Sequence, residues 1–283
     1  MNEHGKQSSP SPASPSTPVP TAPARCKPFS PRALHRQLFI DAAIWWGYKG
    51  TLILILMFGL LRMSRGQDAA ATLLGLFVAF MAGWFLYSLL SARTAQQLPR
   101  ITELIEVHRE EAEATLAAAL RRFPLQRSIR LLLYHRLAVL QHQSKHFEET
   151  ASICQTLLSY NLGHAQDVRS HLLLMLAESM LQRHDLMGAW RALIHLHWQR
   201  LNLIEALQVV GLQARYEVAA GHDAAALEGL ENKIAMAELM PAPQCGAVHA
   251  TLAQAARRIE HPRTQWLQRR TELLCTVEQL RSV

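Results

Sequence analysis

The chain has 283 residues, of which 49% are hydrophobic and 18% are charged. The apolar content is too high for a disordered protein. The 13 glycines and four cysteines exclude a collagen-like or disulfide-scaffolded chain. Because soluble domains usually carry about 25% charged residues, the low charge fraction predicts a helical protein with part of its apolar surface in a membrane.

The net charge of +7 is concentrated in the N-terminal third of the chain. Residues 1–99 contain nine Lys and Arg against three Asp and Glu, whereas residues 100–283 contain twenty against nineteen. The nearly neutral folded part lacks the basic surface that holds nucleic acid. We therefore expect no nucleic-acid partner.

Residues 1–31 contain eight of the 13 prolines and almost no large apolar side chains. Such a segment cannot bury enough surface to offset its ordering entropy. The first apolar run begins after residue 40, too late for a signal peptide. The segment is therefore predicted to be a disordered, Ser/Pro-rich cytoplasmic tail.

Two long apolar segments follow, at residues 42–61 and 69–90. The first contains one charged residue, Lys49, and the second contains none. Each is long enough to cross a bilayer, which takes about 20 apolar residues. The seven residues between them require an antiparallel arrangement. The sequence thus predicts a transmembrane helical hairpin, with transmembrane helix 1 at 42–61 and transmembrane helix 2 at 69–90.

Aromatic residues gather at one end of this hairpin, where Trp and Tyr favour the membrane interface and a lysine can reach it. The predicted interface anchors are Trp45, Trp46, Tyr48, Lys49, Trp84 and Tyr87. Seven Lys and Arg flank the outer ends of the hairpin, against two in the link. This asymmetry predicts an integral membrane protein with both termini in the cytoplasm, and a bacterial inner membrane fits the short charged link.

Small residues recur every four positions on one face of the second span, at Ala71, Gly75, Ala79 and Gly83. Small residues at this spacing let two helices approach closely. The predicted partner of this face is the first span. The alternative is another membrane subunit, in a homo- or hetero-oligomer.

Residues 94–122 are predicted to form one connecting helix, an exposed rod whose glutamates face solvent. From residue 124 to 283, helix pairs recur in units at 135–158, 174–196 and 214–230. Aligning Ala138, Ala177 and Ala214 gives offsets of 39 and 37 residues. A fourth pair, at 244–260 and 263–280, matches the other units poorly.

At these residues the chain resembles the tetratricopeptide repeat family. The likeness covers about residues 124–235 and consists of a small residue, a short turn, an aromatic residue or Leu, and a second small residue, as in Ala177, His184-Asp185-Leu186 and Ala189. The order of membrane anchor and repeats is similar to that of HemY-type proteins. The resemblance implies an all-α, TPR-like α-solenoid of antiparallel helix pairs whose concave face binds peptides or protein surfaces.

In stacked helix pairs the first helix of each pair lines the inner surface, and each pair is stable because it packs on its neighbours. Positions near the small residue of each first helix therefore predict a groove of mixed polarity that binds a protein partner. The predicted groove residues are His135, Val139, His142, His171, Leu174, Glu178, Gln208 and Arg215.

Residues with other potential chemistry are scattered. The cysteines are Cys26, Cys154, Cys245 and Cys275. They are too far apart for a zinc pattern, and we interpret them as small core residues in a reducing compartment. His142 and His146 have metal-ligand spacing, but no carboxylate or cysteine completes the set. Nucleotide-binding and hydrolase motifs are also missing. The sequence therefore predicts no catalytic residue, no metal and no cofactor.

Three functions remain open. The leading hypothesis is a membrane-anchored scaffold or adaptor, not an enzyme, that binds protein partners and whose residues 94–283 capture them alone. The second is an accessory subunit of a membrane enzyme or transporter, held through the hairpin. The third is a membrane-tethered enzyme with an unrecognised site. A C-terminal basic cluster faces solvent, anionic lipid or an acidic partner; it comprises Arg257, Arg258, Arg263, Arg269 and Arg270.

Overall fold

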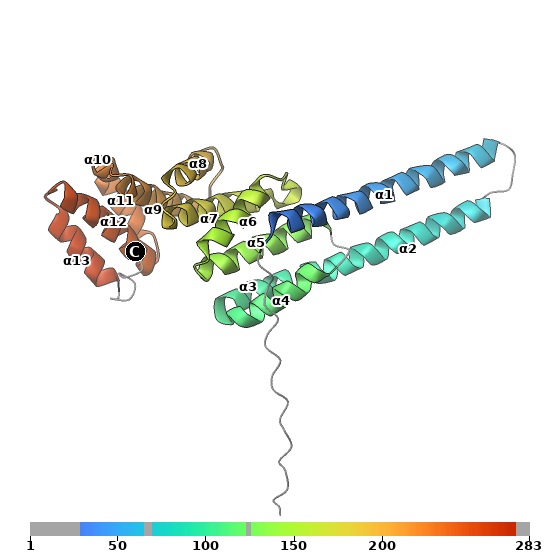
Figure 1. The fold of residues 1–283 in the computed structure, drawn as a ribbon, viewed down its shortest axis with the longest axis horizontal. Coiled ribbons are helices and arrows are strands. Elements are labelled where there is room, and N and C mark those ends of the chain that lie inside the picture. The colour runs from blue at the N-terminus through green and yellow to red at the C-terminus, as the bar shows by residue number, and fades with distance from the viewer. Residues whose placement is uncertain (1–28, 65–69, 123–125, 276–283) are drawn as a thin grey trace, which may run out of the picture.

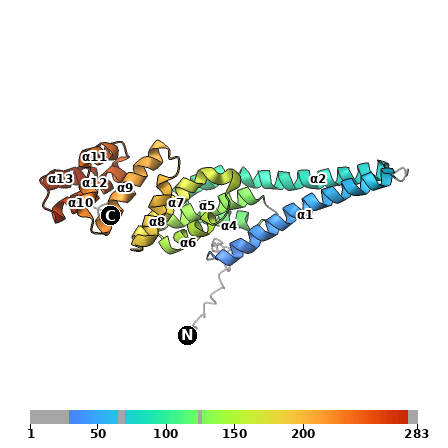
Figure 2. The same cartoon turned by 90° about the horizontal axis from the view of Figure 1, so that it is seen from above.

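The structure is a computed structural model that describes residues 29–64, 70–122 and 126–275, without the side chains of residues 60, 62–64, 70–73 and 164–165. All regular structure in these ranges is helical. Two long helices, α1 (Pro31–Ser64) and α2 (Ala70–Ala95), extend from one end of an elongated array of shorter helices (Figures 1 and 2). The all-helical part of the predicted fold class is therefore confirmed.

Helices α1 and α2 are both long and apolar enough to cross a membrane. Their most apolar windows are each only 6% buried, whereas a core helix of a soluble protein buries such residues. The two helices contact each other through aromatic rings. Tyr48 stacks on Phe80 with ring centroids 3.8 Å apart, and Trp45 lies 5.1 Å from Trp84.

The beginning of the fold lies earlier in the chain than the sequence predicts. Residues 1–28 of the predicted tail, including Cys26, lie outside the described residues. The last three tail residues are wrongly assigned, because Phe29 packs edge-on against Tyr134 at 6.0 Å and Pro31 begins α1. Proline suits this first helical position because its missing N–H has no partner there in any helix.

The first three turns of α1 belong to the core of the helical array. Leu34 and Leu38 are buried against it. Asp41, one turn further on, is also buried and forms an ion pair with the buried Arg130. Helix α1 is thus a single rod that begins in the array and continues into the exposed apolar segment.

The predicted connecting helix at 94–122 is two helices rather than one. Helix α3 (Leu98–Val107) and helix α4 (Arg109–Arg121) meet at His108, whose φ of −133° and ψ of 79° interrupt the helix. The break lets both helices turn their apolar sides inward, so that Ile101 and Leu116 are fully buried. The expectation of an exposed rod is wrong, because a straight helix would leave one half of this apolar stripe uncovered.

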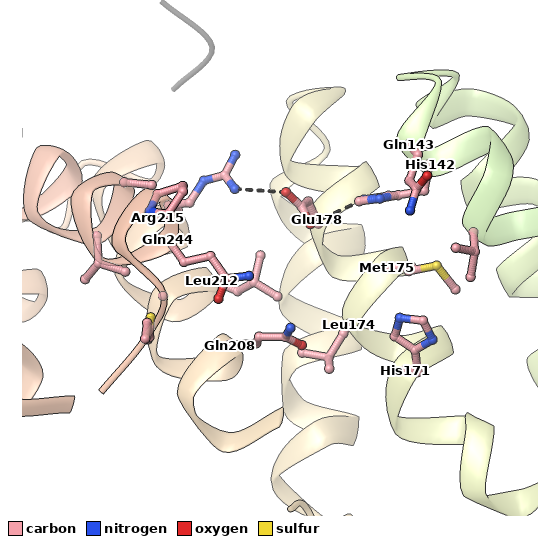
Figure 3. Close-up of a pocket in the computed structure, with 16 residues that line it drawn as sticks. His142, Gln143, His171, Leu174, Met175, Glu178, Gln208, Leu212, Arg215 and Gln244 are labelled. Atoms are coloured by element: carbon pink, nitrogen blue, oxygen red, sulfur yellow. Dashed lines mark hydrogen bonds and ion pairs between the residues drawn. The ribbon is translucent and has the colours of Figure 1, made fainter. Parts of the chain in front are cut away.

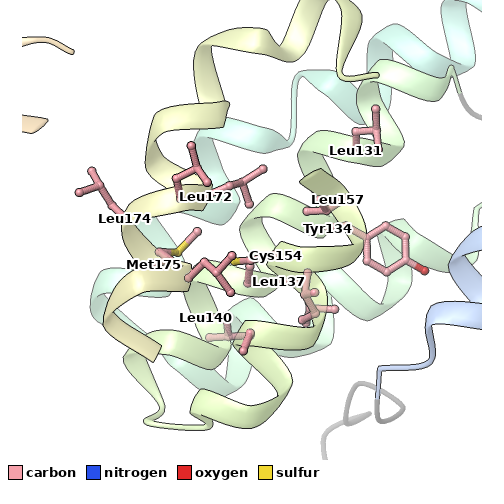
Figure 4. Close-up of a cluster of buried hydrophobic side chains, with 14 of the residues drawn as sticks. Leu131, Tyr134, Leu137, Leu140, Cys154, Leu157, Leu172, Leu174 and Met175 are labelled. Carbon is pink, nitrogen blue, oxygen red and sulfur yellow. The ribbon is translucent and has the colours of Figure 1, made fainter. Parts of the chain in front are cut away.

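The rest of the array is a succession of helices in which most pack against the next, while α10 and α11 both pack against α9 and α12. Figure 4 shows the core that α5, α6 and α7 share, where Leu137, Cys154 and Leu172 come together. Cys154, Cys245 and Cys275 are buried free thiols, as expected of small core residues. The helices are α5 (Arg127–Gln143), α6 (Phe147–Leu158), the 3₁₀ helix η1 (Gly163–Val168), α7 (Arg169–Gln182), α8 (Leu186–His197), α9 (Leu203–Ala219), α10 (Asp223–Leu227), α11 (Leu230–Glu238), α12 (Ala242–Arg258) and α13 (Thr264–Leu274).

Side-chain caps fix two of these helix starts. Asp185 accepts a hydrogen bond from the backbone N–H of Gly188 at 2.9 Å and begins α8. Asn202 and Glu205 form a reciprocal capping box at the start of α9. Such caps satisfy N–H groups that have no partner within the helix, and both are visible in the sequence as polar residues before an apolar run.

Four interhelical turns share one backbone geometry. Lys145, His184, Gly221 and Glu260 have φ between 53° and 77° and are spaced by 39, 37 and 39 residues. In each turn the next N–H donates to the carbonyl five residues earlier, at 2.8–2.9 Å, which is the bond of a Schellman helix end. The fourth helix pair therefore repeats the same turn, although it matches the other units poorly in sequence.

Replacing His184 with glycine is expected to stabilise the chain by about 0.5–1 kcal/mol, because a residue with a Cβ is strained at positive φ. His184 is exposed, so that no packing is lost. Denaturant unfolding of the full-length chain in detergent measures the change. The control is His195→Gly on the exposed side of α8, which is expected to destabilise by about 0.5 kcal/mol. A destabilising His184→Gly would contradict the turn geometry.

Candidate functional site

A cavity of about 530 Å³ opens between α5, α7, α9 and α12, the first helices of the four pairs (Figure 3). Buried apolar side chains form part of its wall, including Leu174, Met175, Leu212 and Val248. Gly211 lets α9 and α12 approach here, since a Cβ at this position would lie 3.2 Å from Val248 Cγ2. The cavity thus offers an apolar wall held by close helix packing.

Charged groups cross the cavity between three helices. Glu178 on α7 lies between His142 on α5 and Arg215 on α9, with Nε2–Oε2 and Nη1–Oε1 distances of 3.3 and 3.2 Å (Figure 3). Burial raises the pKa of Glu178, but the hydrogen bond and charge of His142 and the charge of Arg215 outweigh it, so that the pKa is lowered. Glu178 is therefore a fixed anion held on both oxygens.

Two histidines lie together at the α5–α7 contact. His135 Nε2 is 2.8 Å from His171 Nδ1, so that one ring donates and the other accepts. Burial, the neighbouring His171 and Arg136 lower the pKa of His135 from 6.5 to about 3. Burial and the charges of Arg136 and His142 also lower the pKa of His171. Both rings are therefore neutral at physiological pH.

Glutamine side chains supply further polar groups at the cavity. Gln143, Gln208 and Gln244 line it from α5, α9 and α12. Within the described part of the chain, their amides make no hydrogen bond to other side chains or to the backbone. A primary amide both donates and accepts, so these groups can pair with the backbone or polar side chains of a bound molecule.

The structure brings the predicted groove residues together. Seven of the eight line the cavity, and His135, the eighth, lies behind the lining residue His171. The seven are Val139, His142, His171, Leu174, Glu178, Gln208 and Arg215. Whether they bind a partner stays a prediction.

The sequence did not indicate the contribution of α12. His171, Gln208 and Ala247 all line the cavity, and each lies 13 residues before the positive-φ residue of its turn. If Glu260 had been recognised as the equivalent turn residue of the fourth pair, the same spacing of 13 residues would have predicted that Ala247 lines the cavity. The common position of the turn in all four pairs is not apparent from the sequence, because glycine occupies it in only one of them.

The remaining polar candidates have ordinary structural roles. Among the described residues there is no group of three or more metal-ligating side chains, and His146 pairs with Gln141 at 2.7 Å. In the C-terminal basic cluster, Arg258 and Arg270 form ion pairs at 3.2 and 3.1 Å with Asp223 and Glu238.

The predicted interface anchors lie together where α1 and α2 meet the array. Trp45, Trp84 and Tyr87 form a chain of neighbouring rings that also includes Tyr48. The Lys49 ammonium lies over Trp45 at 4.7 Å and near Trp46 at 5.5 Å, which keeps its charge on the aromatic cluster.

The small-residue face of α2 points away from α1. A Cβ added at Gly75 or Gly83 would meet nothing within 4 Å, and Ala79 is exposed. The side chain of Ala71 lies outside the described residues. The prediction that this face packs on the first span is therefore wrong, because the aromatic side of α2 makes that contact instead.

Comparison with known proteins gives no relative: no family model, no curated protein and no solved structure matches this chain.

Proposed function

We propose that this protein is a membrane-anchored helical-repeat scaffold that binds a protein partner at the cytoplasmic face of a membrane. The observation that carries the proposal is the cavity between α5, α7, α9 and α12, in which four successive first helices present an apolar wall and fixed polar groups. A groove of this kind suits a peptide segment or a protruding part of a partner. The repeated turns support a TPR-like solenoid of stacked pairs.

Membrane insertion of α1 and α2 as a transmembrane hairpin supplies the anchor. The two helices have the required length and hydropathy and leave large apolar side chains exposed along their length. Basic residues flank their outer ends, which favours a cytoplasmic location for both termini and for the array. The short charged link between the two helices favours a bacterial inner membrane.

A second candidate function is an accessory subunit of a membrane enzyme or transporter. The open face of α2 at Gly75, Ala79 and Gly83 favours it, because α1 does not cover these residues. Small residues on a lipid-facing helix permit close packing by another membrane helix.

Affinity capture from membranes by the full-length chain distinguishes the two candidates. Arg215→Glu and Gln244→Arg change the cavity, and each is expected to reduce capture of the partner about tenfold or more. The exposed Arg191 on α8 provides the matched control Arg191→Glu, which is expected to capture as the unchanged chain does. Gln244→Arg breaks no internal ion pair and should leave the stability of the chain unchanged. A loss of capture by this variant therefore reports on partner binding alone.

The opposite pattern would overturn the scaffold proposal. If both cavity variants retain their partners while Gly75→Leu and Gly83→Leu lose them, the membrane helices form the interface. A fragment of residues 94–283 is a poor probe, although the sequence suggested it. This fragment removes Leu34, Leu38 and Asp41 and leaves Arg130 unpaired in the core.

A further inference from the structure

A second cavity, of about 500 Å³, lies where α1 and α2 meet the beginning of α5. Aromatic side chains line one side of it: Trp45 and Trp46 from α1, and Trp84 and Tyr87 from α2. Arg127 and Ser128, in the first turn of α5, line the opposite side. The cavity therefore has an apolar end formed by the two long helices and a polar end formed by the array.

The polar end carries an uncompensated positive charge. Asp41 is the acidic lining residue, and Arg130 holds both of its oxygens. The exposed Arg127 donates to the backbone carbonyl of Asn161 at 3.1 Å, lies 6.0 Å from the centre of the Tyr160 ring and has no carboxylate partner among the described residues. One guanidinium is thus available to an anion that enters the cavity.

The apolar end continues along the exposed surface of the long helices. Beyond the aromatic residues, toward the far ends of the long helices, Leu54, Phe77 and Met81 are exposed. In a bilayer, tryptophan and tyrosine occupy the headgroup level, and the apolar segments occupy the hydrocarbon level. A molecule at this place would therefore meet a cation at the water side and hydrocarbon on the other side.

We propose that this cavity binds one glycerophospholipid. Arg127 and Ser128 hold its phosphodiester, whose single negative charge matches the one lining guanidinium that has no carboxylate partner. The glycerol region lies among Trp45, Trp84 and Tyr87, and an acyl chain extends along the apolar helices. The inference rests on the proposed membrane insertion and does not depend on the partner cavity.

Native mass spectrometry of the full-length protein in detergent tests the assignment. The probes are phosphatidylglycerol, diacylglycerol with the same chains, and inorganic phosphate. We expect one phosphatidylglycerol per chain, with diacylglycerol at least about tenfold weaker because it lacks the phosphate. Phosphate at an equal concentration is expected to displace no lipid, since it gains nothing from the aromatic end.

Variants of Arg127 test whether this side chain holds the lipid. Arg127→Gln is expected to weaken phosphatidylglycerol binding about tenfold or more, and Arg127→Lys is expected to retain part of it. Arg109 also begins a helix and is exposed, so Arg109→Gln is the matched control and is expected to bind normally. Ala42→Phe, which fills the cavity, is expected to exclude the lipid while Arg127 stays in place.

Several results would overturn the assignment: no lipid adduct on the unchanged chain, equal binding of diacylglycerol, displacement by inorganic phosphate, or an Arg127→Gln variant that binds normally. Alkaline carbonate extraction separates this failure from failure of the anchor. A chain that stays in the membrane pellet but binds no lipid overturns the lipid site alone. A chain released into the supernatant overturns the anchor and the lipid site together.

Discussion

Replacing Arg130 with methionine is expected to lower the free energy of unfolding of the full-length chain by about 3–5 kcal/mol, because the change leaves a buried carboxylate without its partner. Arg130 and Asp41 are 1% and 3% exposed. Gln37 also accepts from Arg130, at 3.2 Å. Denaturant unfolding in detergent micelles, followed by circular dichroism, measures the loss.

The paired change Asp41→Leu with Arg130→Met separates the ion pair from packing. Apolar residues of similar volume often replace a buried ion pair without loss of stability, and we therefore expect the double variant to recover most of the loss. Arg109→Met, at an exposed helix start, is the control and is expected to change stability by less than about 0.5 kcal/mol. A single Arg130→Met variant as stable as the control would show that the buried pair does not hold α1 to α5.

This ion pair contributes to a rigid connection between the two long helices and the array. The first turns of α1 are part of the core, and the same helix continues without interruption into its apolar segment. The array therefore has a fixed orientation relative to the long helices, in contrast to a domain on a flexible linker. With the proposed membrane insertion, this connection would hold the cavity at a defined height and angle above the bilayer.

The sequence predicted those features that depend on local periodicity. Apolar length indicated α1 and α2, and the spacing of small residues indicated the helix pairs. The same spacing placed Val139, Glu178 and Arg215 on the inner side of successive first helices, where all three line the cavity. Helical periodicity determines which side of a helix a residue occupies, and this information is present in one segment alone.

Features that depend on distant contacts or on the turn backbone were not predictable. Asp41 and Arg130 are 89 residues apart, and no local pattern pairs them. Lys145, His184 and Glu260 adopt the positive φ usually marked by glycine, so that residue type alone does not reveal the shared turn. The small residues of α2 predicted packing on α1, but the aromatic contacts between the two helices decide which side of α2 faces α1.

Acidification is expected to destabilise the chain through His135. Its pKa is about 3 in the fold and about 6.5 when exposed, so that below pH 6.5 the unfolded chain takes up a proton that the folded chain does not. The contribution of His135 to the free energy of unfolding is thus fully present above pH 6.5 and is lost as the pH falls toward 3. One pKa unit corresponds to about 1.4 kcal/mol, which gives a loss of about 3 kcal/mol between pH 6.5 and pH 4.

The variant His135→Gln tests this contribution, since glutamine does not titrate and can still donate to His171. Carboxylates titrate in the same range in both proteins, and the difference between their unfolding free energies therefore isolates His135. We expect the unchanged chain to lose about 3 kcal/mol more than the variant from pH 6.5 to pH 4. Equal losses would mean that His135 takes up a proton in the folded state.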